Sequence, residues 1–172
     1  GASAMMITPP PFYKHNARQF ELLLERISQQ TTLPLVLFNS PSRVSINLGA
    51  ENVIRYVNKF PNIIGVKESS GTLKDVIQIG QALPGGCNLL QGIDDAFLPS
   101  LASGAAGGIM AFACPMPTIL TNIFSSWQTS DNQTALQKQL SIIPVMKIIG
   151  REPMPILVKE AMNVVGRPMG PT

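Results

Sequence analysis

Two kinds of apolar pattern alternate along the first two thirds of the chain. Short continuous apolar runs are typical of strands that are buried on both faces. Between these runs, apolar residues recur every three or four positions, which is the spacing of a helix with one buried face. The strands predicted from this pattern are Met5–Ile7, Leu35–Phe38, Ile63–Val66, Asn88–Leu90 and Gly108–Phe112. The helices predicted between them are Asn16–Gln29, Glu51–Asn58, Thr72–Ala82 and Asp94–Ser103.

This alternation predicts an α/β fold built on a parallel sheet that is covered on both faces. Strand–helix units of similar size, about 25 residues each, suit a (β/α)₈ barrel, in which functional residues gather at the carboxyl ends of the strands. A doubly wound sheet should instead carry a glycine-rich phosphate loop after its first strand. Pro9, Pro10 and Pro11 occupy that place. The barrel is therefore the favoured architecture.

The last third of the chain has a helical pattern only. Predicted helices are Thr118–Gln128, Asn132–Ile149 and Pro155–Val164. We predict that residues 1–115 form a partial barrel of five βα units and that residues 116–172 are C-terminal helices of the same domain.

The composition excludes several classes of function. Only 13% of the residues are charged, roughly half the usual share, which indicates a protein that is mostly buried or covered by partners. The 13 Lys and Arg residues are scattered, whereas a nucleic-acid surface would cluster them. No apolar stretch has the roughly 18 residues that a membrane span needs. Cys87 and Cys114 lie far apart and suggest neither a disulfide framework nor a zinc site. We predict a cytoplasmic protein without nucleic-acid, membrane or metal partners.

Lys67 is the most informative residue. It ends the apolar run Ile63–Val66 and is followed by the small, turn-forming residues Ser69, Ser70 and Gly71. Burial at the end of a strand disfavours the ammonium form and lowers the pKa of a lysine. A neutral amine can attack a ketone and form a Schiff base. The alternative is a lysine whose aliphatic stem reaches past the sheet edge to water.

The residues that follow all five strands carry a resemblance to a known family. These segments are Thr8–Tyr13, Phe38–Arg43, Val66–Gly71, Gln91–Asp95 and Gly104–Ile109. In this order and spacing they resemble strands four to eight of the dihydrodipicolinate synthase/N-acetylneuraminate lyase family of Schiff-base class I aldolases. Residues 152–159 resemble the opening of the family's C-terminal helix.

The resemblance implies a role for four residues. Lys67 matches the lysine that attacks the keto carbon of pyruvate or a related 2-oxo acid. Arg43 matches an arginine near the site entrance that binds the carboxylate of the second substrate. The alternative is a solvated surface arginine. Ile109 matches a residue whose backbone carbonyl faces the site, or it is plain core. Gly92 fits a place where backbone approaches a ligand closely, or a tight turn.

Asp94 and Asp95 follow the fourth predicted strand. We expect them to be helix N-cap and first-turn acids rather than catalytic carboxylates.

One aromatic position departs from the family pattern, and a second stays open. The family usually has a tyrosine at the position of Phe38, and its hydroxyl relays protons to and from the bound substrate. Phenylalanine has no such proton, and general acid–base help is worth about 10²–10⁴ in rate. The family also has a tyrosine after strand four that reaches a neighbouring subunit's site. Either Phe12 or Tyr13 holds that place; Tyr13 is a candidate for the proton transfer, and loop packing is its alternative role.

The family's first three strands have no counterpart in these residues. A complete barrel needs about 250 residues, so the chain corresponds to strands four to eight plus the C-terminal helices. Three explanations stay open: a fragment of a longer enzyme, the ordered part of one, or a natural half that pairs with another polypeptide.

The resemblance implies a lyase or aldolase of dihydrodipicolinate synthase type, without metal or organic cofactor, that needs the missing strands and forms a homo-oligomer such as a tetramer. The alternatives are a 2-keto-3-deoxy sugar-acid aldolase or an N-acetylneuraminate lyase-like enzyme. An alternative of another class is a catalytically impaired binding or regulatory protein, which Phe38 favours.

Overall fold

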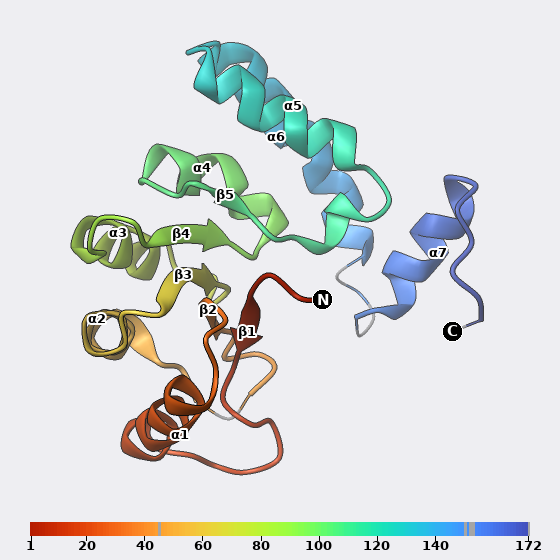
Figure 1. The fold of residues 1–172 in the computed structure, drawn as a ribbon. Helices are drawn as coiled ribbons and strands as arrows, with labels where there is room; N and C mark the ends of the chain where they lie inside the picture. The colour runs from red at the N-terminus through yellow and green to blue at the C-terminus, as the bar shows by residue number, and fades with distance from the viewer. Residues whose placement is uncertain (45, 150, 152–153, 172) are drawn as a thin grey trace.

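A computed structural model describes residues 1–44, 46–149, 151 and 154–171. Glu152 and Pro153, which contribute to the resemblance of the closing segment, lie outside the described residues. Within the described part the sheet has five strands, all parallel, in the order β1-β2-β3-β4-β5. The predicted α/β alternation is confirmed (Figure 1).

The strands are β1 (Met5–Ile7), β2 (Leu35–Asn39), β3 (Ile63–Glu68), β4 (Asn88–Gln91) and β5 (Gly107–Gly108). The α-helices are α1 (Ala17–Gln30), α2 (Gly49–Lys59), α3 (Leu73–Ala82), α4 (Phe97–Ala102), α5 (Pro117–Gln128), α6 (Asn132–Ile149) and α7 (Ile156–Val164). Two short 3₁₀ turns are η1 (Asp94–Ala96) and η2 (Ala111–Ala113). Strands that are consecutive in the sequence lie next to each other in the sheet, as a barrel requires.

Helices α1, α2 and α3 pack against one face of the sheet (Figure 1). That face carries Leu37, Val66 and Leu89, which are buried in a core shared with these helices. Tyr56 of α2 is fully buried there, and its hydroxyl donates a hydrogen bond to the carbonyl of Ala17 at 2.6 Å. Because side chains alternate along a strand, Phe38 and Lys67 point to the other face.

A second apolar cluster holds the C-terminal helices together. Helices α5 and α6 run side by side (Figure 1) and pack with α4 through residues such as Leu101, Ile123 and Ile142. The side chain of Asp131 accepts a hydrogen bond from the Thr134 backbone at 3.1 Å, at the start of α6. The domain boundaries predicted from the sequence stay a prediction.

The fifth strand was predicted too long. It contains Gly107 and Gly108 only, and the residues predicted to continue it turn into η2. Glycines stabilise a strand poorly, and the Asp94 carboxylate accepts a hydrogen bond from the Phe112 backbone at 2.9 Å. This bond holds the chain at η2, and the Phe112 side chain is buried in the second cluster.

The tips of β3 and β4 come so close that a side chain at position 92 would force its neighbours to move. The Gly92 backbone donates a hydrogen bond to the carbonyl of Glu68 at 2.8 Å. A Cβ atom on Gly92 would lie 1.8 Å from Ser69 Oγ and 3.0 Å from Lys67 Cε. The glycine is therefore required by the close approach of these two strand ends.

We predict that Gly92→Ala lowers the free energy of unfolding by about 1–3 kcal/mol, the usual effect of forcing an extra carbon into a packed site. Urea denaturation followed by circular dichroism measures it. Gly85→Ala is the matched control, because a Cβ there meets nothing within 4 Å. Ser69→Ala in the Gly92→Ala background should restore part of the loss. Equal stability of the two single variants would contradict the close approach.

Candidate active site

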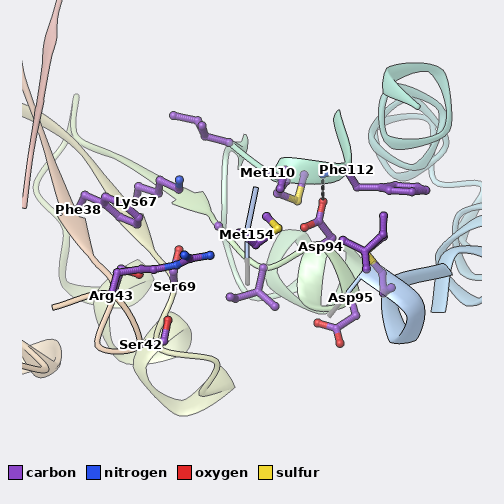
Figure 2. A pocket seen from close by; sticks show the side chains of 17 residues that line it. Phe38, Ser42, Arg43, Lys67, Ser69, Asp94, Asp95, Met110, Phe112 and Met154 are labelled. Carbon is purple, nitrogen blue, oxygen red and sulfur yellow. Dashed lines mark hydrogen bonds between the residues drawn. The ribbon is translucent and has the colours of Figure 1, made fainter. Parts of the chain in front are cut away.

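Five of the six residues singled out from the sequence line one pocket. Phe38, Arg43, Lys67, Gly92 and Ile109 surround a cavity of about 640 Å³ at the carboxyl ends of the strands. This size falls within the usual range for small-molecule sites. Figure 2 shows Phe38, Arg43, Lys67 and Ser69 at one side of the pocket and Asp94, Met110 and Phe112 at the other.

Lys67 reaches the pocket from the end of β3. It is half-buried, and its Nζ lies 4.1 Å from the centre of the Phe38 ring on β2. The two residues are direct partners in the strand register. The β2–β3 pairing therefore places the aromatic ring alongside the lysine, as Figure 2 shows.

The surroundings of Lys67 favour its neutral form. Burial lowers the pKa of its amine below the ordinary value of 10.5; the Asp94 carboxylate acts in the opposite direction, and the Arg43 guanidinium lowers the pKa further. The face of an aromatic ring attracts a cation, so the Phe38 ring favours the ammonium form and opposes the effect of burial on the pKa of Lys67. A lysine with a lowered pKa is a better nucleophile near neutral pH.

Arg43 is exposed at the entrance of this pocket. It follows a tight turn after β2, in which the backbones of Arg43 and Val44 both donate to the carbonyl of Ser40, at 2.9 and 3.1 Å. The salt bridges found among the described residues lie elsewhere, between Glu21 and the pair Arg55 and Lys59. The Arg43 guanidinium is therefore in a position to meet an anionic ligand.

Ile109 and Tyr13 have different surroundings. The Ile109 side chain lines the pocket and is partly exposed, and its backbone donates to the carbonyl of Gln91 at 2.9 Å. Tyr13 is not among the pocket's lining residues. It is 71% exposed in the loop after β1, where its ring meets His15 edge to face, and the neighbouring Phe12 is 92% exposed. The structure thus brings Tyr13 to the surface and not to this pocket.

Asp94 has a larger role than the sequence suggested. It does lie in the first turn of η1, but the N-cap of that turn is Ile93 and no side chain caps it. The Asp94 carboxylate lines the pocket and holds the Phe112 backbone, and burial raises its pKa. Its place after a strand was visible in the sequence, whereas its partner 18 residues further on was not.

Ser69 was also missed. Its side-chain oxygen is buried and has no hydrogen-bond partner among the described residues, although the residue lines the pocket. Buried polar atoms normally have a partner, so this hydroxyl is left unsatisfied next to the pocket. The only signal in the sequence was its position two residues after Lys67.

The described residues contain no group of three or more His, Cys, Asp or Glu side chains placed to hold a metal ion. Within the same residues, no helix has the length and apolar character needed to cross a membrane.

We predict that Lys67→Met removes a stability cost that the wild type carries at neutral pH. A lowered pKa means that the unfolded chain binds more protons than the native one between the native pKa and 10.5, so wild-type stability rises with pH across that window. Urea unfolding at intervals from pH 7 to the alkaline limit should show a smaller rise for the variant and an equal or higher stability at pH 7. If the free energy of unfolding rises equally with pH in both proteins, burial does not lower the pKa of Lys67.

The comparisons with known proteins agree with one another. A profile of the dihydrodipicolinate synthetase family matches residues 1–172. The chain is 29% identical over 171 residues to the 4-hydroxy-tetrahydrodipicolinate synthase of Methanopyrus kandleri, covering 99% of this chain and 57% of the relative. It is also 29% identical to the enzyme of the same name from Thermoanaerobacter sp., of which it covers 58%.

Solved structures give the same result for the fold. The 4-hydroxy-tetrahydrodipicolinate synthase from Methylacidiphilum fumariolicum superposes on all of this chain with a TM-score of 0.93 at 27% identity, and this chain covers 57% of it. A dihydrodipicolinate synthase crystal structure matches with a TM-score of 0.92 at 29% identity and 59% coverage. The chain therefore spans somewhat more than half the length of these relatives, and its sheet is part of a (β/α)₈ barrel. It belongs to the dihydrodipicolinate synthetase family.

Proposed function

We propose that this chain is part of a class I aldolase or lyase that acts on pyruvate or a related 2-oxo acid through a Schiff base, with dihydrodipicolinate synthase-like activity. One observation carries the proposal: the half-buried Lys67 amine, with a lowered pKa, lines the pocket at the carboxyl ends of the parallel strands. The family membership and the similarity to synthases support it.

The proposed chemistry begins with the neutral Nζ of Lys67. Its lone pair forms a bond to C2 of the 2-oxo acid. The carbonyl oxygen takes up one proton from the attacking nitrogen and a second from solvent, and it leaves as water, which gives a protonated imine. Loss of a proton from C3 gives the enamine that attacks the second substrate. Arg43 offers a guanidinium to a carboxylate.

Phe38 has no group for the proton transfers. Its ring lies against Lys67 where a hydroxyl could have exchanged protons with the substrate. Tyr13, at the surface, could serve only a neighbouring copy of the chain in a homo-oligomer. We therefore propose that this chain forms the imine readily and completes the later steps slowly, which keeps the binding or regulatory role as an alternative.

A second candidate is a 2-keto-3-deoxy sugar-acid aldolase. The unpartnered Ser69 hydroxyl favours it, because rotation of this buried side chain toward the pocket would let a hydroxylated aldehyde satisfy the oxygen, whereas a less hydroxylated one would leave it unpaired. Steady-state assays with aspartate semialdehyde and with glyceraldehyde as second substrates, each with pyruvate, separate the two candidates.

The proposed activity needs more of the barrel than these residues form. Parallel sheets are covered on both faces, and here the face opposite α1–α3 exposes Met6, which is 42% accessible. We propose that three further strands complete the barrel and cover this face. Assays therefore use the longest polypeptide that the gene encodes around these residues.

We predict that pyruvate and borohydride together add a stable mass to the protein, since reduction fixes the imine on Lys67. Intact-protein mass spectrometry measures the gain. Lys67→Ala should show none, and Lys74→Ala, which changes an exposed lysine on α3, should behave like the wild type. Absence of any gain in the wild type would rule out the aldolase function.

We predict that Phe38→Tyr raises turnover by about tenfold or more, within the range that general acid–base catalysis supplies. The rate of borohydride trapping should change much less, because the imine forms before the slow proton transfers. An unchanged kcat would mean that another group already transfers the proton.

A further inference from the structure

Two polar side chains are buried directly behind the pocket face of the sheet. Asn39 and Glu68 are 0% and 1% exposed. They are partners in the β2–β3 register, one position beyond the pair formed by Phe38 and Lys67. Because side chains alternate across a strand, the amide and the carboxylate lie on the helix-covered face while Phe38 and Lys67 face the pocket.

The Asn39 amide uses its hydrogen-bonding groups on both sides. Its Nδ2 donates to Glu68 Oε2 at 2.9 Å and to Asn47 Oδ1 at 3.0 Å, and its Oδ1 accepts from the Leu48 backbone at 3.1 Å. These bonds tie the end of β2 to the loop that leads into α2. They also tie β2 to β3 through side chains, in addition to the backbone ladder.

Glu68 connects this hydrogen-bond network to the residues that follow β3 and β4. Its second carboxylate oxygen accepts a hydrogen bond from the Ser70 backbone. Its carbonyl accepts from Gly92 at 2.8 Å, and the Ser69 backbone donates to the Asn39 carbonyl at 2.9 Å. The backbone that follows Lys67 is thereby fixed between β2 and β4, close to where the strands end.

We propose that Asn39 and Glu68 are positioning residues that hold the Lys67 amine in the pocket against Phe38; their value for catalysis rests on the proposed function. Lys67 precedes Glu68 directly, so rotation of the β3 tip would carry Nζ away from the pocket. A displacement of about 1 Å at a reacting group can lower a rate about 10²-fold. A buried carboxylate is also unfavourable unless it is well paired, and Glu68 accepts bonds from both Asn39 and Ser70.

The informative variant is Glu68→Gln, which keeps the shape but can accept only one of the two hydrogen bonds. If the pair positions Lys67, the loosened tip lets water reach the amine, and the pKa of Lys67 rises toward 10.5. If Glu68 acts only as a nearby negative charge, its removal lowers the pKa of Lys67 instead. If it serves only stability, the pKa stays the same. The direction of the change therefore distinguishes the three roles.

The experiment measures two quantities at a temperature where circular dichroism shows every variant folded. Trace acetylation with acetic anhydride over a pH series, read by peptide mass spectrometry, gives the pKa of Lys67 without any substrate. Borohydride trapping with pyruvate gives the rate of imine formation. For Glu68→Gln we expect the pKa to rise and trapping to slow about tenfold or more.

Three further variants complete the design. The double variant Asn39→Asp/Glu68→Gln reverses the cross-strand hydrogen bond, because the new amide on β3 donates to the new carboxylate on β2, and should restore much of both quantities. Glu51→Gln makes the same chemical change on an exposed residue of α2 and should alter neither. Asn47→Ala removes the peripheral acceptor of Asn39 and should give a smaller change in the same direction, which keeps the test valid if Glu68→Gln does not fold.

An unchanged or lowered pKa of Lys67 in Glu68→Gln and Asn47→Ala would overturn the positioning role, even with a loss of thermal stability. If the wild type is never trapped by pyruvate, the proposed function fails, and the acetylation result alone still decides whether the pair positions Lys67.

Discussion

The structure depends on the placement of one amine at the junction of three strands. Lys67 leaves the end of β3 with the Phe38 ring of β2 on one side and Gly92, just after β4, packed closely on the other. Burial at this junction disfavours the ammonium ion, while the Phe38 ring and Asp94 favour it. The proposed reactivity of the lysine follows from this balance, in which burial is the largest influence on its pKa.

The remaining architecture serves to keep that junction rigid. The parallel register puts successive strand ends at one edge of the sheet, and the buried face is fixed by helices α1 to α3. The C-terminal helices reach the same pocket: Met146 and Ile149 of α6 and the nearby Met154 line it. Asp94 links these two parts, since it lines the pocket and holds the Phe112 backbone of the second cluster. A side chain at position 92 or a break in the Asn39–Glu68 hydrogen bond would disturb the strand ends and the pocket residues that they carry.

Local patterns predicted the features that depend on local sequence. The apolar runs located β1 to β4, and helical spacing located α1 to α3, α5 and α6 within a few residues, because burial repeats with the period of each element. The family resemblance of the segments after the strands, and not any local periodicity, singled out Phe38, Arg43, Lys67, Gly92 and Ile109, which line one pocket. The length of β5 was predicted wrongly because the chain beyond it is held by a hydrogen bond between Asp94 and Phe112, 18 residues apart. Ser69 and Glu68 were missed because their roles depend on which neighbours face them, and no periodicity encodes that.

The most direct test of the central claim is the titration of the Lys67 amine itself, followed by NMR in protein labelled with ¹³C at the lysine Cε. We predict one resonance, absent in Lys67→Met, that titrates clearly below the ordinary lysine value of 10.5. A Lys67 resonance that titrates at or above that value would contradict it, because the amine would then be charged and solvated at neutral pH and unsuited to attack a ketone.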